Sequence, residues 1–240
     1  MGIQEGLDAI KAYKAEQERR KEAADKPKTV WLNIPDGKTF EIRFLQELDK
    51  SGAGYSEKNG LGFFATEHSN PDDFRKKALC TIETGECYGC EQKELFYKAK
   101  DNVRGGGWKA KSRLYINVLV RDDKGEEYVA VMSQPNGAKS VIAPMLVDEA
   151  IDGGVTGAWW KITRTGKGSE TAYRARISPP KDDVNPEDYE LFDLKNCVRE
   201  VDYEDQPEHF SVTAERPDSG GERETASAGS SSKVDTSEEW

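Results

Sequence analysis

One histidine and three cysteines stand close together in the first half of the sequence. They are His68, Cys80, Cys87 and Cys90, and the last two frame a Cys-x-x-Cys motif. Such a motif presents two thiolates to one ion, and a third cysteine with a histidine completes a tetrahedral set of ligands. The segment between His68 and Cys87 is polar, so metal binding would supply folding free energy that its own burial lacks. The spacing predicts one structural zinc ion held by these four residues.

Other interpretations of the cluster are a disulfide, a redox pair or chance clustering. A disulfide is typical of secreted proteins and would leave unpaired thiols, and a thioredoxin-like pair accompanies a βαβ unit. A deaminase-type catalytic zinc needs His-x-Glu and Pro-Cys-x-x-Cys, whereas Asn70 and Glu86 occupy the corresponding positions here. Cys197 and His209 lie far along the chain, and we expect both to be ordinary solvent-side residues.

The elements that must position these ligands are mostly strands. Alternating apolar residues predict strands over 30–34, 40–44, 113–121, 127–132, 158–165 and 171–177, and a helix is predicted over 138–151. Five or so short antiparallel strands with one helix fit an OB-fold-like, partly open five-stranded barrel, a mainly β fold with some α structure. The metal cluster would form a zinc-containing subdomain of it.

A second set of residues suggests contact with nucleic acid. The even positions of 113–121 are apolar and the odd positions carry cationic, aromatic and amide groups, while residues 97–111 read as a flexible basic loop. Aromatic rings stack on bases and Lys or Arg contact phosphates, although such alternation is also common in ordinary sheet packing. The predicted contacts are Arg43, Tyr97, Lys98, Lys100, Arg104, Trp108, Lys109, Lys111, Arg113, Tyr115, Asn117, Arg121, Trp159, Lys161, Tyr173 and Arg174.

The net charge of −10 conceals two differently charged parts. Residues 182–240 hold 18 Asp and Glu against 5 Lys and Arg, which leaves 27 acidic and 30 basic residues in 1–181. We therefore expect three parts: a charged helical arm (1–27), a folded core (28–180), and a short helix followed by a disordered acidic tail (181–240). The core contains no apolar run of membrane-spanning length and the N-terminus does not resemble a signal peptide, so we expect a cytoplasmic protein.

The acidic tail has two interpretations. It could be a plain solubilising segment, or it could cover a cationic groove when nucleic acid is absent and recruit partner proteins. The ending places an aromatic ring among carboxylates, which favours a docking motif formed by Asp235, Glu238, Glu239 and Trp240. The N-terminal arm is equally open: it could be a solvated helix, or an element of self-association or partner docking.

Taken in order, four features resemble the single-stranded-DNA-binding, helix-destabilising proteins of tailed phages of the T-even type. They are the strand 40–45, the His-x₁₁-Cys-x₆-Cys-x₂-Cys set, the strand 115–120 after its basic lead, and the acidic C-terminus. The resemblance implies a zinc-containing OB-fold that binds exposed single strands during replication, recombination and repair in the host cytoplasm. It also implies tail contacts with replication proteins, and a base-contacting role for Tyr115.

The resemblance has limits, and two other classes of function remain open. The arm lacks the short Lys-Arg-Ser-Thr-like element associated with cooperative filaments in that family, so self-association on DNA is possible and its cooperativity is left open. A zinc-dependent nuclease or deaminase is one alternative, but no second cluster of histidines or carboxylates stands at metal spacing, and we expect no enzymatic activity. An RNA-binding adaptor is the other, because no motif reads a 2′-hydroxyl.

Overall fold

The computed structural model describes residues 28–136, 140–167, 170–178 and 184–211, together with a few positions of the arm: Gly6, Ile10, Lys11, Tyr13, Lys14 and Gln17. Contacts group Met1–Phe210 into one compact unit and Ser211–Trp240 into another. The packed part of the chain therefore extends to Phe210, past the boundary at 180 that the sequence suggests. Within the described residues, no helix combines the length and the apolar character that crossing a membrane requires.

The sheet is antiparallel, open and seven-stranded, in a mixed α/β structure. Its order is β3-β2-β4-β1-β6-β7, with β5 paired to the other edge of β4. The strands are β1 (Thr39–Phe44), β2 (Phe63–Ser69), β3 (Lys77–Leu79), β4 (Lys111–Arg121), β5 (Glu127–Pro135), β6 (Trp159–Thr165) and β7 (Ala172–Ser178). Five of the predicted strands are confirmed as β1 and β4–β7. The segment 30–34 makes only an isolated bridge from Trp31 to Val131.

The prediction of a partly open, five-stranded barrel is confirmed only in part, since the sheet is open and has seven strands. It missed β2, whose apolar residues do not alternate strictly, and β3, which is only three residues long. These two strands pair with each other, and β2 continues the sheet beside the first half of β4, where Glu67 faces Lys111. The second half of the same edge of β4 pairs with β1, through to Glu41 opposite Arg121.

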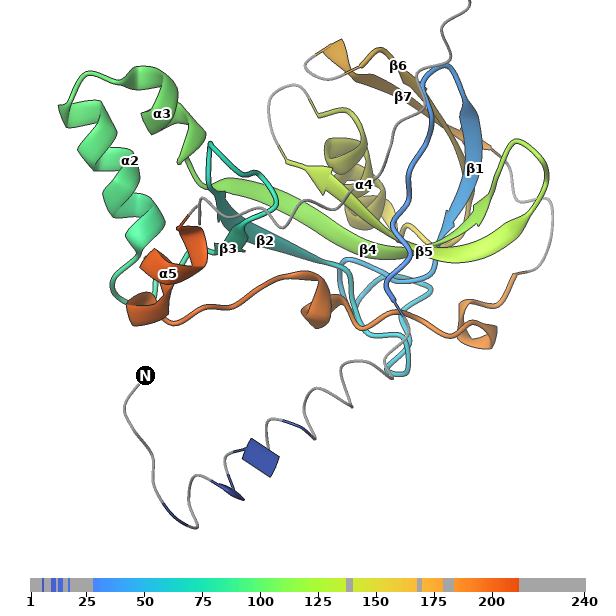
Figure 1. The fold of residues 1–240 in the computed structure, drawn as a ribbon. Coiled ribbons are helices and arrows are strands. Elements are labelled where there is room, and N and C mark those ends of the chain that lie inside the picture. The colour runs from blue at the N-terminus through green and yellow to red at the C-terminus, as the bar shows by residue number, and fades with distance from the viewer. Residues whose placement is uncertain are drawn as a thin grey trace, which may run out of the picture. The chain divides into compact units, whose positions relative to one another are not determined.

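The helices lie at two places on this sheet. Figure 1 shows α2 (Tyr88–Lys98), α3 (Asn102–Gly107) and α5 (Gln206–Phe210) gathered at the end where β2 and β3 lie, and α4 (Ile142–Asp152) beside β6 and β7. The predicted helix 138–151 is confirmed as α4, with positions 138 and 139 outside the described residues. We call β2, β3, α2, α3 and α5 the metal module.

The predicted flexible basic loop is helical instead. Residues 97–111 contain the end of α2 and all of α3, and the Asp101 carboxylate caps α3 by accepting the Arg104 N–H at 3.0 Å. The glycines that suggested a loop serve close packing. A Cβ on Gly105 would lie 2.9 Å from the Tyr97 ring, and one on Gly107 would lie 2.6 Å from Pro71.

The main core fills the concave side of the sheet under α4. The even positions of 113–121, predicted to face inward, are all fully buried, and Leu146 of α4 packs on them. Phe44 and Trp160 meet edge to face at a centroid distance of 5.4 Å. This face therefore follows the sequence pattern directly.

The opposite face is covered by a segment that we call the strap, residues 184–198. Tyr189 and Leu191 pack on Leu119 and Trp159, while Phe192 and Leu194 pack around Tyr115. The strap holds two 3₁₀ turns, η2 (Pro186–Asp188) and η3 (Leu194–Cys197), in place of the short helix predicted at the start of 181–240. Asn185 and Asp193 cap these turns with their side chains, a local hydrogen bond that competes with helix continuation.

Candidate metal centre and basic groove

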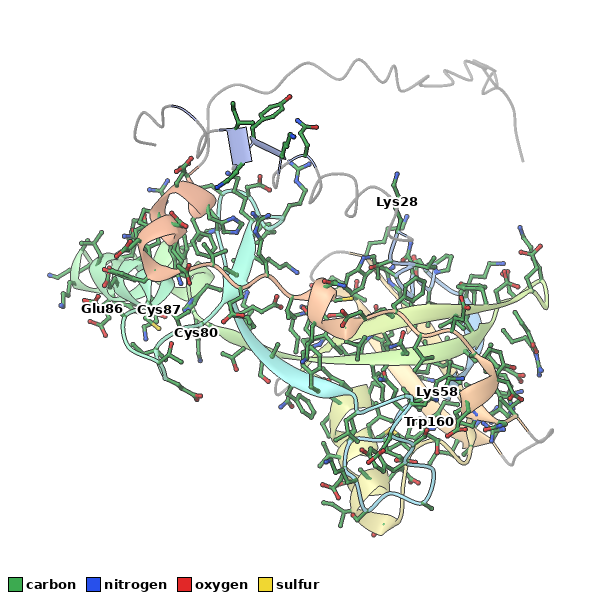
Figure 2. The ribbon with its side chains drawn as sticks, turned by 90° about the horizontal axis from the view of Figure 1, so that it is seen from below. Lys28, Lys58, Cys80, Glu86, Cys87 and Trp160 are labelled. Carbon is green, nitrogen blue, oxygen red and sulfur yellow. The ribbon has the colours of Figure 1, made fainter. Side chains whose placement is uncertain are left out.

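The four predicted ligands converge in the metal module. His68 lies near the end of β2, Cys80 directly follows β3, and Cys87 and Cys90 lie at the start of α2. Their ligand atoms all lie within 4.8 Å of one another. Figure 2 shows Cys80 and Cys87 close together, next to Glu86. The cluster could hold one metal ion.

The distances fit one tetrahedral ion. Cys80 Sγ lies 3.8 Å from Cys87 Sγ and 3.7 Å from Cys90 Sγ, and Cys90 Sγ lies 3.4 Å from His68 Nε2. Ligand bonds of about 2.3 Å for sulfur and 2.0 Å for nitrogen give tetrahedral edges of about 3.8 Å and 3.5 Å. The donor set therefore matches an ion that prefers thiolate and imidazole ligands.

A hydrogen bond orients the histidine. The Nδ1 atom of His68 lies 2.7 Å from the carbonyl oxygen of Trp108, which fixes Nδ1 as the donor and leaves Nε2 as a ligand. Burial lowers the pKa of His68, so the imidazole stays neutral, as coordination requires. Burial likewise raises the pKa of the Cys80 thiol and raises that of Cys90 to about 12, so without a cation these two thiols hold their protons.

The close approach of α2 to β2 depends on one glycine. A Cβ on Gly89 would lie 2.3 Å from Cγ of the His68 ring. Only glycine between the two α2 ligands allows this contact, which brings the Cys-x-x-Cys turn against the imidazole.

The C-terminal end of the described chain packs on the metal module, which the sequence did not indicate. Phe210 lies in a small core with Trp108 and Ala78, its ring 5.2 Å from the Trp108 ring. Asn70 Nδ2 donates to the Phe210 carbonyl at 2.6 Å, and His209 Nε2 lies 2.9 Å from the Lys77 carbonyl. His209 is therefore part of this packing rather than an ordinary solvent-side residue.

Five of the predicted nucleic-acid contacts are buried and serve the fold, and one of them is Tyr115, which packs under the strap. Trp108 belongs to the module core and Trp159 to the core under the strap. Asn117 is fully buried and exchanges hydrogen bonds with the backbone of Phe192, and Arg43 donates to the Thr156 carbonyl at 3.1 Å. The odd face of β4 was predicted to be open, but the strap covers its second half.

Nine further predicted contacts are scattered. Arg121 lies 4.5 Å over the Trp159 ring and pairs with Glu41 and Glu127, and Lys161 pairs with Glu41 at 3.0 Å. The helices α2 and α3 and the turns beside them carry Tyr97, Lys98, Lys100, Arg104 and Lys109, and β7 carries Tyr173 and an exposed Arg174. The proposed tail residues Asp235, Glu238, Glu239 and Trp240 lie outside the described residues.

Lys111, Arg113 and Tyr115 meet at a depression that we call the basic groove. It consists of two hollows of about 370 Å³ and 150 Å³ that share Glu67, Lys77 and Arg113. The cationic residues lining it outnumber the single carboxylate of Glu67, which accepts a hydrogen bond from the Tyr115 hydroxyl at 2.6 Å. These cations are Arg75, Lys77, Lys111, Arg113 and Arg199.

Aromatic rings accompany these charges. Trp31, 45% exposed, lines one hollow and lies edge to face with Tyr115 at 6.3 Å, and Phe74, 64% exposed, lines the other. The sequence prediction missed Trp31, Phe74, Arg75, Lys77 and Arg199. The run Phe74-Arg75-Lys76-Lys77 was a usable signal, but it stood inside a segment interpreted only as a polar linker between metal ligands.

The groove concentrates positive charge. Burial lowers the pKa of Lys77, and Arg113 and Lys111 lower it further against the opposing effect of Glu67. Among the described residues, no ion pair engages Lys77, Lys111, Arg113 or Arg199. The groove can therefore accept an anionic ligand without first breaking salt bridges.

Comparison with known proteins gives no relative: no family model, curated protein or solved structure matches the chain.

Proposed function

We propose that this protein binds single-stranded DNA in the basic groove, without enzymatic activity and with little dependence on sequence. The observation that carries the proposal is that cationic side chains without ion pairs lie beside exposed aromatic rings in one depression. Such a groove tracks the phosphates while rings stack on bases, and stacking tolerates any sequence because every base has a flat face. Protection of exposed strands during phage replication, recombination and repair would follow.

The order of elements is consistent with the proposed architecture. Strands β1, β4, β5, β6 and β7, with α4 between β5 and β6, form a five-stranded unit in which β1 pairs with β4 and β6. The remaining strands β2 and β3, with α2 and α3, are inserted between β1 and β4. We propose an OB-fold-like unit carrying an inserted module, an architecture whose members bind oligonucleotides.

Zinc is the ion that we propose for the module. Three thiolates and an imidazole are a common structural zinc set, and four protein ligands leave no open position for a reacting water. The ion would hold β2, β3 and α2 together, and β2 and β3 carry Glu67 and Lys77 of the groove. Its role in DNA binding is therefore to position the groove.

The experiment that tests the function is a fluorescence titration with single-stranded DNA, duplex DNA and RNA at two salt concentrations. We expect preference for the single strand, quenching of tryptophan, and affinity that falls with salt because bound cations release counterions. Arg113→Ala should weaken binding and reduce the salt dependence, while Lys124→Ala, an exposed turn variant far from the groove, should not. Tight duplex binding with no single-strand preference contradicts the proposal, and stronger RNA binding favours the RNA adaptor instead.

We also propose that the acidic tail competes with DNA for the groove and recruits basic partner proteins. Truncation after Ser211 keeps Phe210 in the module core and removes only residues outside the described part. This truncation should tighten DNA binding at low salt and have less effect at high salt, since the competition is electrostatic. Equal affinities of the full and truncated chains at low salt would contradict competition.

A further inference from the structure

A separate hollow of about 350 Å³ opens on the other side of Arg113. It lies where β4 and β5 meet the start of α4 and β7, and its lining includes Arg113, Ser133, Gln134, Ser140, Ile142 and Tyr173. Arg113 and Ser133 also line the basic groove, so the two depressions share these residues. Its volume is at the low end of the roughly 300–1,000 Å³ of ligand pockets, which suits a small flat group.

Polar groups in this hollow lack partners within the described part of the chain. The Ser140 Oγ is buried and forms no hydrogen bond there. The side-chain amide of Gln134 also forms no hydrogen bond with the described residues, although its atoms remain accessible to solvent. Buried polar groups are nearly always paired, because leaving one unpaired costs the free energy of its lost hydration. A ligand that entered the hollow would supply those partners.

The available groups form a mixed set of donors and acceptors. Arg113 uses Nε to donate to Ser133 Oγ at 3.0 Å, and its terminal nitrogens have no acceptor among the described residues. The Gln134 amide offers both a donor and an acceptor, and the Ser140 hydroxyl can act as either. Guanidinium, amide and hydroxyl groups are those that proteins use to read the edges of bases.

The walls add an apolar surface. The Tyr173 ring and the Ile142 side chain both line the hollow, and both belong to or pack against the main core, which holds them in place. An aromatic wall stacks on the face of a base while polar groups bind its edge. A phosphate would leave the ring and the amide unused, and an apolar ligand would leave Gln134 and Ser140 unpaired.

We infer that this hollow is a base pocket, which takes one nucleobase turned out of the single strand bound in the groove. The inference rests on the proposed function and adds to it a point at which the protein reads base identity. Arg113 stands at the junction, where it contacts the backbone on one side and the inserted base on the other.

The test compares two ligands of equal length, a single-stranded homopolymer and a fully abasic deoxyribose-phosphate strand. Tyr173→Ala should weaken binding of the base-bearing strand about fivefold or more while leaving the abasic strand within about twofold of the unaltered protein. Tyr173→Phe should retain most of the affinity, because it keeps the ring. Ile151→Ala, at an exposed position of α4, is the matched control and should change neither.

Base selection gives a second readout. Gln134→Leu and Ser140→Ala should alter the ranking of dA, dC and dT homopolymers without changing the affinity for the abasic strand. Thermal unfolding of each variant establishes that it is folded. If folded Tyr173→Ala binds both strands as the unaltered protein does, or loses both equally, the base pocket is excluded while single-strand binding stands. If the unaltered protein binds neither strand, the proposed function fails and the base pocket with it.

Discussion

Gln206 accepts a hydrogen bond from the backbone N–H of Tyr88 at 3.0 Å, at the residue that follows the metal ligand Cys87. The same amide donates to Thr81 Oγ1 at 3.1 Å, beside the ligand Cys80, and to the Val201 carbonyl at 3.0 Å. Gln206 is fully buried. One side chain near the C-terminal end of the described chain thus joins both cysteine-bearing loops.

Gln206→Leu should loosen this end of the chain. The substitution leaves the Tyr88 N–H and the Thr81 hydroxyl without their buried partner, and each such loss costs about 1–3 kcal/mol. We expect faster proteolysis between residues 199 and 211 and a lower midpoint in urea. Glu204→Leu, at an exposed neighbouring position, is the control and should leave both unchanged.

Removal of the metal ion should unfold the metal module before the rest of the sheet. The unaltered protein should contain about one zinc ion per chain by elemental analysis, and a chelator should lower the melting temperature because binding free energy contributes to folding. Far-ultraviolet circular dichroism should show a loss of helix with most strand signal retained. Cys90→Ser should lose the metal and Cys197→Ser should keep it. A chain that folds with the same melting temperature in chelator would contradict a structural ion.

DNA binding should take up a proton at alkaline pH. Burial and neighbouring cations lower the pKa of Lys77 in the free protein, and a phosphate strand would raise it again. Between these two pKa values binding adds a proton, so affinity should fall as the pH rises through that window, at most tenfold per pH unit. Titrations from neutral pH to about pH 10.5 measure this. Lys77→Arg, which stays charged, should abolish the effect.

The same burial of Lys77 has the opposite consequence for folding. Because the pKa is lower in the folded chain than in the unfolded one, the unfolded chain holds more protons within that alkaline window. The stability contribution of this residue therefore rises with pH there, while DNA affinity falls. Urea unfolding of the free protein and of Lys77→Arg over the same pH range separates the two effects.

Asn117→Leu tests whether the Asn117 side chain contacts DNA, as the sequence pattern suggests, or stabilises the fold. If this side chain faced DNA, as alternation along 113–121 suggests, the variant would lose affinity and keep its stability. In the structure its amide binds Gln46 and the Phe192 backbone, so the variant should lose about 1–3 kcal/mol of stability through unpaired groups. Chemical unfolding should show this loss of stability. The affinity of each folded molecule for single-stranded DNA should stay the same.

The metal ligands and five strands could be predicted because both depend on local sequence. Cys-x-x-Cys spacing fixes which thiols meet, and alternation fixes the inner face of β4. The outer face could not be predicted, because it depends on the strap, whose Phe192 lies 75 residues further along the chain than Asn117. The pattern Arg-Leu-Tyr-Ile-Asn is the same whether a strap or solvent covers the odd positions. The glycine run 105–107 misled for a similar reason, since helix packing against Tyr97 and Pro71 is not a local property.

The strap also sets an order of events during synthesis. Residues 184–210 leave the ribosome after every strand of the sheet and every candidate metal ligand, so the growing chain can assemble β1–β7 and the metal cluster before they emerge. Until then Leu119, Tyr115 and Trp159 face water on an apolar surface that would favour aggregation. Arrival of the strap covers that surface and attaches α5 to the module. A nascent chain stalled before residue 184 would therefore be the form most in need of a chaperone.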